Sequence, residues 1–227
     1  TQCKSNKVIE NIINNFLVKK NSFIFESVEK RTLRGRYTII GADPDKIWEF
    51  NKNRITLYHN NSKSNIKDIP YKYLKKLIED FNFPLPKELP SICSLLVGYF
   101  SYDIIRYIEK VPDKCKDDIK IPDVRLMRPK TIIIHDNLLK KIYFIINCFA
   151  DQKISNYKKF YLKETEYIKK IKELTFFSKN KVIMKPYVNK KIYVKSNISK
   201  KIFKSIVGKA KKYIKKGDIF QVVLSQR

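Results

Sequence analysis

Residues 36–50 are Arg36-Tyr37-Thr38-Ile39-Ile40-Gly41-Ala42-Asp43-Pro44-Asp45-Lys46-Ile47-Trp48-Glu49-Phe50, and this stretch organises the first half of the chain. Its β-branched and aromatic residues predict one strand over residues 37–41 and another over residues 47–50. The intervening Ala42-Asp43-Pro44-Asp45 has the composition of a turn, because proline fixes φ and aspartate hydrogen-bonds to nearby backbone. The polar residues 51–53 lead into residues 55–59, whose alternating polarity predicts a hairpin.

Apolar spacing outward from this stretch predicts further helices and strands. Helical periodicity covers residues 6–18, a short segment after Pro70, residues 102–108, a long basic stretch over 157–174 and the segment from Ser199 to Gly217. Strand patterns cover residues 22–28, 93–100, 131–135, 141–149 and 181–184. Residues 60–68 are polar and predict a loop. Because groups of adjacent strands alternate with helices, this order predicts an α+β fold with a largely antiparallel sheet.

The two ends of the sequence indicate a piece of a longer protein. The first residue is Thr1, and the last stretch is Gly217-Asp218-Ile219-Phe220-Gln221-Val222-Val223-Leu224-Ser225-Gln226-Arg227. That stretch has the pattern of a helix stop, a turn and a buried strand. A core strand that ends the chain would leave backbone groups and apolar side chains without partners.

Composition excludes several classes of function. The net charge of +27 invites a nucleic-acid interpretation, but the lysines are spread along the chain without a recognition motif, so no specific nucleic acid is expected as a partner. No apolar run reaches the roughly 18 residues of a membrane helix, so no membrane is expected either. Four scattered cysteines and two histidines predict no zinc site and suit a reducing compartment, hence a cytoplasmic protein.

Three segments are more specific than the composition. The first combines Phe25-Glu26-Ser27-Val28-Glu29 with Arg34-Gly35-Arg36-Tyr37-Thr38-Ile39-Ile40-Gly41. The second combines Val97-Gly98-Tyr99-Phe100-Ser101-Tyr102-Asp103 with Arg106 and Met127-Arg128-Pro129. The third runs from Ser196-Asn197-Ile198-Ser199 through residues 217–227. In this order and at these separations they resemble component I, the large subunit, of anthranilate synthase, from about Ile12 to Arg227.

The resemblance implies a fold, a division into domains and an activity. The fold is α+β, with orthogonally packed, largely antiparallel sheets and flanking helices. Residues 1–175 would form the N-terminal domain, 176–195 a linker and 196–227 the start of the chorismate-binding domain. The large subunit converts chorismate and ammonia to anthranilate and pyruvate in tryptophan biosynthesis. It requires Mg²⁺, receives ammonia from a glutamine amidotransferase subunit and is inhibited by tryptophan.

The acidic residues indicate that the chemistry lies elsewhere. A magnesium site for a dicarboxylate substrate needs clustered carboxylates, and pairs such as Asp43 and Asp45 show no convergent arrangement in the sequence. By the resemblance, the magnesium-binding glutamates, the catalytic histidine and the substrate-binding segments fall after Arg227. We therefore expect no catalytic residue and no metal ligand within this chain.

The resemblance places part of a tryptophan site on Ser27 and Glu26. A free amino acid needs an acceptor for its ammonium group, donors for its carboxylate and an apolar slot for the indole. Neighbouring residues of a regular strand face opposite sides, so only one of the two would contribute its side chain; Ser27 is the first choice and Glu26 the second. Arg36, beside the next predicted strand, is a candidate for the ligand's carboxylate.

Other residues have structural interpretations. Asp103 and Arg106 stand three apart on a predicted helix and predict a local ion pair. Gly98 predicts close packing within a strand, and His135 is expected to be a turn residue. Two alternative functions stay open: the related aminodeoxychorismate synthase, and a non-catalytic module that binds tryptophan or polyanions.

Overall fold

The computed structural model describes residues 6–17, 19–26, 35–114, 117–152, 154–177 and 193–226. The chain divides into two compact units, Thr1–Val182 and Ile183–Arg227. The predicted division at 175 and 196 stays a prediction. The predicted strand over 181–184 lies outside the described residues.

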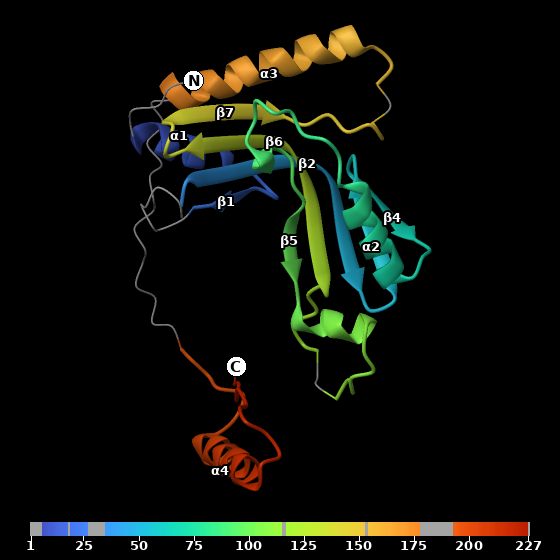
Figure 1. The fold of residues 1–227 in the computed structure, drawn as a ribbon, viewed down its shortest axis with the longest axis vertical. Coiled ribbons are helices and arrows are strands. Elements are labelled where there is room, and N and C mark those ends of the chain that lie inside the picture. The colour runs from blue at the N-terminus through green and yellow to red at the C-terminus, as the bar shows by residue number, and fades with distance from the viewer. Residues whose placement is uncertain are drawn as a thin grey trace. The chain divides into compact units, whose positions relative to one another are not determined.

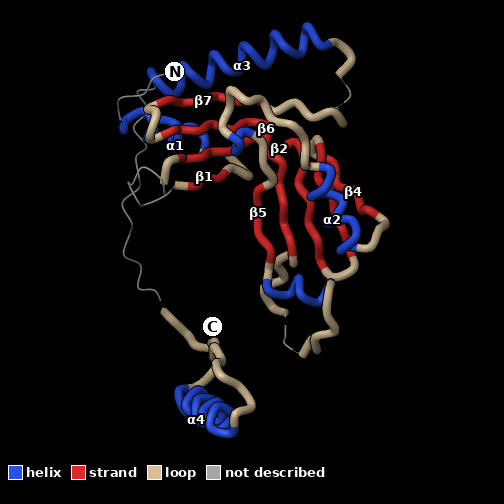
Figure 2. The backbone as a smooth tube through the Cα atoms, in the orientation of Figure 1, coloured by secondary structure: helices blue, strands red, loops and turns tan. Residues whose placement is uncertain are grey.

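An antiparallel sheet of seven strands forms the centre of the first unit (Figures 1 and 2). Its main path is β4-β3-β2-β6-β5, while β1 pairs with β2 and β7 pairs with β6. The strands are β1 (Phe23–Phe25), β2 (Tyr37–Asn51), β3 (Arg54–His59), β4 (Ser62–Ile66), β5 (Val97–Phe100), β6 (Val124–Asp136) and β7 (Lys141–Ile146). The predicted α+β class with antiparallel strands and flanking helices is confirmed.

Two long strands, β2 and β6, join two halves of this sheet. At one end β2 and β6 pair with each other and with β1 and β7, and at the other end they pair with β3 and β5. Figure 1 shows the first group running across the view and the second group running down it. The sheet therefore bends in the middle of β2 and β6, and each half presents its own surface to a layer of helices.

The bend lies where two prolines face each other. Pro44 of β2 is opposite Pro129 of β6, and the register shifts between Pro44 and Lys46, which leaves Asp45 as an extra residue in β2. Neither proline can donate a backbone hydrogen bond, and a bulge is the usual place for proline inside a sheet. The predicted turn over residues 42–45 is wrong: β2 continues through it, because β6 pairs with β2 on both sides of the bulge.

The bulge also changes which residues of β2 face which side. Tyr37 and Ile39 pack in one core cluster with the β6 residue Ile134, whereas Trp48 and Phe50 pack with even-numbered β6 residues after the bulge. On this face of the sheet, one extra residue thus moves the β2 positions from odd to even numbers, while Ile40 and Ala42 pack on the opposite face before the bulge. Both halves of β2 therefore pair with β6, although the alternation of β6 has no extra residue.

Helices cover the sheet as separate layers. The helices of the first unit are α1 (Asn6–Phe16), α2 (Pro70–Asp80) and α3 (Tyr157–Phe177), with 3₁₀ helices η1 (Ser91–Cys93) and η2 (Tyr102–Tyr107), while α4 (Lys200–Lys216) belongs to the second unit. Apolar residues of α1 and α3, among them Ile12, Phe16 and Ile171, pack against the first half of the sheet. Leu74 of α2 and the partly buried Ile104 of η2 pack against the second half. No helix in the described part of the chain is long and apolar enough to cross a bilayer.

A network of charges holds the bend. Arg128, beside Pro129, donates from Nε to Asp45 Oδ1 at 2.8 Å and from Nη2 to Asp151 Oδ1 at 2.9 Å. The side chains of Arg128 and Asp45 are only 9% and 8% exposed. Lys46 adds a contact of 2.5 Å to Asp151, and the Arg128 guanidinium lies 3.9 Å from the centre of the Phe149 ring.

A second group of contacts fastens α1 and α3 to the same place. Asp43, whose φ of 52° is in the left-handed region that aspartate tolerates, accepts hydrogen bonds from three elements. The donors are Lys19 after α1 at 2.9 Å, Tyr167 of α3 at 2.6 Å and Thr131 of β6 at 3.2 Å. Burial opposes ionisation of Asp43, but these donors outweigh it and lower its pKa.

Two expectations about strands need correction in the first unit. The predicted loop over 60–68 contains β4, which pairs with β3 after a turn in which Asn60 and Asn61 both have positive φ, the geometry of a tight hairpin. The predicted strand over 93–100 is shorter: Cys93 ends η1, and β5 starts at Val97. Close packing at Gly98 is confirmed, since an added Cβ would overlap the carbonyl oxygen of Arg125 on β6.

The second unit consists of α4 and the residues around it. The Ser199 side chain caps its start by accepting from Ile202 N at 3.3 Å, and Gly217 ends it with a φ of 78°, so both predicted helix signals are confirmed. The predicted final strand is not formed among residues 219–226. Within the described part of this unit no strand lies beside them, and Phe220 is 98% exposed.

Replacing Arg128 with methionine should destabilise the first unit. Arg128→Met leaves the buried Asp45 carboxylate without its cation, and removing one partner of a buried ion pair costs about 3 kcal/mol or more. Urea unfolding followed by the fluorescence of Trp48, the one tryptophan of the chain, measures the change. Lys52→Met is the matched control: its partner Asp113 and Lys52 itself are more than half exposed, so no measurable change is expected. An unaltered midpoint for Arg128→Met would show that the bulge alone sets the bend.

The Asp151 contact should make stability depend on pH. Burial opposes ionisation of Asp151, but hydrogen bonds from Arg128 and Lys46 outweigh it and lower its pKa from 3.8 to about 2. The lowered pKa means that the carboxylate stabilises the fold above about pH 4 and loses this effect as pH falls toward 2. Asp151→Asn should therefore cost about 1 kcal/mol at pH 7, after solvent screening of this partly exposed group, and progressively less below pH 4. A difference in unfolding free energy that stays constant from pH 6 to pH 3 would contradict this assignment.

Candidate functional site

Two of the three residues predicted to contact tryptophan lie in the described part of the chain. Glu26 follows the last residue of β1 and is exposed. Arg36 precedes β2, which pairs with β1 from Ile39 to Gly41. Ser27, the first choice from the sequence, lies outside the described residues. The structure therefore places Glu26 and Arg36 near the ends of two paired strands.

Arg36 meets a carboxylate of its own chain. Its Nη2 donates to Asp136 Oδ2 at 2.7 Å and its Nε lies 3.1 Å from the same oxygen. Asp136, the last residue of β6, is fully buried and also accepts from the backbone N–H groups of Leu138 and Leu139 at 3.0 Å each. The guanidinium lies 4.8 Å from the centre of the Tyr37 ring. This pair ties the start of β2 to the turn after β6.

The electrostatics of this clamp follow from burial and its donors. Burial opposes ionisation of Asp136, yet the Arg36 guanidinium and two backbone N–H groups lower its pKa. Sequence patterns do not indicate this partner, because Asp136 is 100 residues from Arg36. His135, predicted as a turn residue, is instead a buried residue of β6, and burial lowers its pKa. Its Nδ1 finds no hydrogen-bond partner among the described residues.

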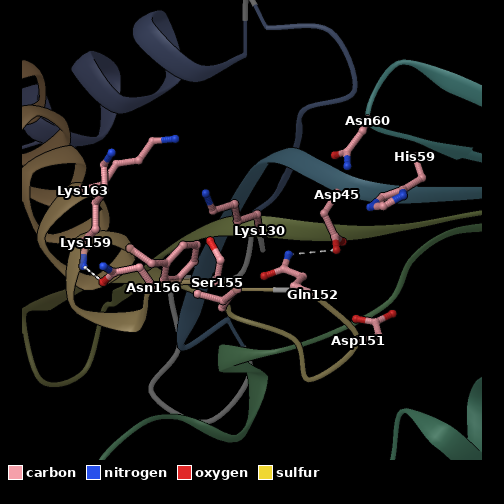
Figure 3. A pocket seen from close by; sticks show the side chains of 12 residues that line it. Asp45, His59, Asn60, Lys130, Asp151, Gln152, Ser155, Asn156, Lys159 and Lys163 are labelled. Carbon is pink, nitrogen blue, oxygen red and sulfur yellow. Dashed lines mark hydrogen bonds between the residues drawn. The ribbon is translucent and has the colours of Figure 1, made fainter.

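The bend of the sheet carries a pocket of about 640 Å³, which we call the bend pocket. Five parts of the structure form it: the bulge of β2 at Asp45, the β3–β4 turn, β6 at Lys130, the segment before α3 and the first turns of α3. Figure 3 shows lysines of α3 on one side, His59 and Asn60 on the other, and Lys130 between them. The residues that line it are Asp45, His59, Asn60, Lys130, Asp151, Gln152, Ile154, Ser155, Asn156, Lys159, Phe160 and Lys163.

Neither carboxylate of the bend pocket is available as a base or as a metal ligand. Asp45 and Asp151 are both bound by Arg128, and Gln152 Nε2 donates to Asp45 Oδ2 at 3.2 Å (Figure 3). Among the described residues, no group of three or more His, Cys, Asp or Glu side chains is arranged to hold a metal ion. The described residues therefore offer binding surfaces, and we identify no acid–base pair among them.

The remaining predicted pair has a structural role. Arg106 Nε donates to Asp103 Oδ1 at 2.9 Å on η2, which confirms the ion pair, and Arg106 also donates to the carbonyl oxygen of Val111 at 2.7 Å. These bonds hold the segment after η2 beside that helix. Sequence reasoning found this pair because its members are local, and it missed the bend pocket, whose residues come from four separate segments.

Comparison with known proteins gives the chain a family. The family model described as chorismate binding enzyme matches residues 20–227. Anthranilate synthase component 1 of Acetivibrio thermocellus is 35% identical over 211 residues, which is 90% of this chain and 42% of that protein. The protein of the same name from Aquifex aeolicus is 33% identical over 93% of this chain and 43% of its own length.

A solved structure has the same fold. Anthranilate synthase component I from Streptococcus pneumoniae TIGR4 superposes with a TM-score of 0.62 at 21% sequence identity, over 88% of this chain and 43% of that one. The chain thus spans less than half the length of the relatives that it matches. With a family model that matches nearly all of its residues, the chain belongs to the chorismate-binding enzyme family, and it is similar to anthranilate synthase component I over most of its length.

Proposed function

We propose that the chain is part of the large subunit of an anthranilate synthase, which converts chorismate and ammonia to anthranilate and pyruvate. The observation that carries the proposal is the similarity to anthranilate synthase component 1 over at least 90% of the chain. The three sequence motifs support it independently of composition. In this proposal the enzyme is cytoplasmic, serves tryptophan biosynthesis and receives ammonia from a glutamine amidotransferase subunit.

The proposal assigns the chemistry to residues outside this chain. Chorismate carries two carboxylates, and a Mg²⁺ ion that neutralises one of them during elimination needs several oxygen ligands close together. Several of the described acidic residues are instead bound to cations of the fold, among them Asp43, Asp45 and Asp136. We therefore propose that the magnesium ligands and the catalytic groups lie outside residues 1–227.

The proposal gives this chain part of the tryptophan site. Ser27 or Glu26 would accept from the ammonium group of tryptophan, and Arg36 would face its carboxylate. The Arg36 side chain is 35% exposed, and its Nη1 makes no hydrogen bond within the described residues, while Nε and Nη2 are held by Asp136. A guanidinium fixed on one edge and open on the other suits a carboxylate ligand, since little rotamer freedom remains to be lost on binding.

The reaction can be tested on the complete product of the gene that encodes these residues. With chorismate, ammonium and Mg²⁺ we expect fluorescent anthranilate and release of one pyruvate, both lost when the metal is chelated. Residues 1–227 alone should form neither product. Anthranilate from residues 1–227 alone would refute the placement of the catalytic groups. Consumption of chorismate without pyruvate release would instead indicate aminodeoxychorismate synthesis and refute the proposed reaction.

The tryptophan site can be tested separately by calorimetry on the purified chain. We expect saturable binding of L-tryptophan, weakened roughly tenfold, or about 1.4 kcal/mol, by whichever of Ser27→Ala and Glu26→Gln alters the side chain that accepts from the ammonium group. Ser27→Ala removes the hydroxyl acceptor, and Glu26→Gln removes the negative charge. Glu79→Gln on α2 is the matched control, since the exposed Glu79 carboxylate pairs with Lys75 on its own helix, and it should bind tryptophan unchanged. Equal affinities in all variants, or no saturable binding, would remove these residues from the site.

A further inference from the structure

We propose that the bend pocket binds a small molecule through a phosphate group. None of Glu26, Ser27 and Arg36 lines the pocket, so this site is separate from the proposed tryptophan site. Its volume of about 640 Å³ is within the usual range for sites of small ligands. Its walls come from the bulge of β2, β6, the β3–β4 turn, the segment after Phe149 and α3, so a ligand would touch both halves of the bent sheet.

The charges that face the pocket favour an anion. Lys159 and Lys163 stand four apart on α3, both line the pocket, and neither side chain has an ion-pair partner among the described residues. Two like charges at this spacing repel each other. The two carboxylates in the pocket wall do not neutralise this repulsion, because Arg128 already binds both of them. An anionic ligand would balance the two lysines without displacing any contact of the fold.

The type of cation favours phosphate over carboxylate. Arginine is the side chain that matches a planar carboxylate with two parallel hydrogen bonds, whereas lysine acts as a point charge that suits phosphate. The one arginine next to the pocket, Arg128, is fully engaged with Asp45 and Asp151. The cations left for a ligand are the lysines Lys159, Lys163 and Lys130. Lys130 already donates one hydrogen bond to Glu164, at 2.7 Å.

Other polar groups of the pocket are ready for the rest of the ligand. Asn60 and Ser155 line it, and their side chains make no hydrogen bond within the described residues. Gln152 Oε1 is buried and has no partner there either, so a donor group of the ligand would satisfy an acceptor that is otherwise costly to bury. Phe160 adds an apolar wall.

A second hollow along α3 differs from the bend pocket in its acidic lining. It shares Lys130 and Lys163 with the bend pocket, and there Lys169 and Lys170 lie with Glu166, Glu173 and other acidic side chains. Those lysines have carboxylates nearby that arginine does not occupy. Substituting Lys169 and Lys170 therefore provides a control with the same change of charge on the same helix.

Inorganic pyrophosphate is a suitable probe, titrated by calorimetry into the purified 227-residue chain at 50 mM and 150 mM NaCl. We expect saturable binding that Lys159→Gln with Lys163→Gln weakens at least tenfold, while Lys169→Gln with Lys170→Gln weakens it less than twofold. Ser155→Asp, which keeps every lysine but adds a negative charge to the pocket, should also weaken binding at least tenfold. Thermal unfolding of each variant confirms that it is folded.

Three results would overturn the proposal. Equal weakening by the two double variants would show attraction by net charge alone, which a chain of +27 exerts on any polyanion. Absence of saturable binding up to millimolar pyrophosphate would show that the pocket holds no phosphate. Succinate binding as tightly as pyrophosphate would show that the pocket does not select phosphate over carboxylate. None of these results bears on anthranilate formation or on tryptophan binding, which involve other residues.

Discussion

The ion pair of Arg128 with Asp45 is the contact on which the rest of the first unit depends. A one-residue bulge in β2 creates the bend, and the bulged residue is the one that Arg128 holds. Without a cation, an aspartate that is 8% exposed would be costly to bury. The same guanidinium reaches Asp151, so the segment before α3 is anchored where the sheet changes direction. The two carboxylates that this guanidinium binds both line the bend pocket, so the bulge, the segment before α3 and the pocket wall meet at this point.

The sequence predicted the elements whose signals are local. Helix α4 was found with both ends, because its start and stop are set by Ser199 and Gly217 alone. The predicted turn at Asp43-Pro44-Asp45 failed for a physical reason. A bulge shifts the alternation of β2 from odd to even positions, so a single long strand has the pattern of two short strands with a turn between them. Only pairing with β6 on both sides keeps the chain extended there, and that pairing joins residues more than 70 positions apart.

Strands at the edges were harder to predict for the opposite reason. β4 consists of Ser62–Ile66, is mostly exposed and has no apolar alternation, so its backbone pairing with β3 alone makes it a strand. Residues 219–226 have the strongest strand pattern near the end of the chain, yet form no strand in the described part of their unit, where no partner strand is present. Strand propensity describes a residue's fit to a paired surface and does not supply the pair.

The candidate sites show the same division between local and distant information. Family motifs brought Glu26 and Ser27 together from the sequence, and Arg36 is a candidate from its place beside the next predicted strand, but the buried Asp136 that fixes Arg36 appears only in the fold. The bend pocket could not be predicted from the sequence for a related reason. In a chain of net charge +27 with lysines throughout, the sequence does not indicate which lysines lack ion-pair partners. The fold decides this by placing its carboxylates. Asp43, Asp45, Asp136 and Asp151 are occupied at the bend and at the clamp, which leaves uncompensated positive charge along α3. Specific anion recognition is therefore to be sought where such lysines line a pocket of fixed shape, and general attraction wherever they line open surface.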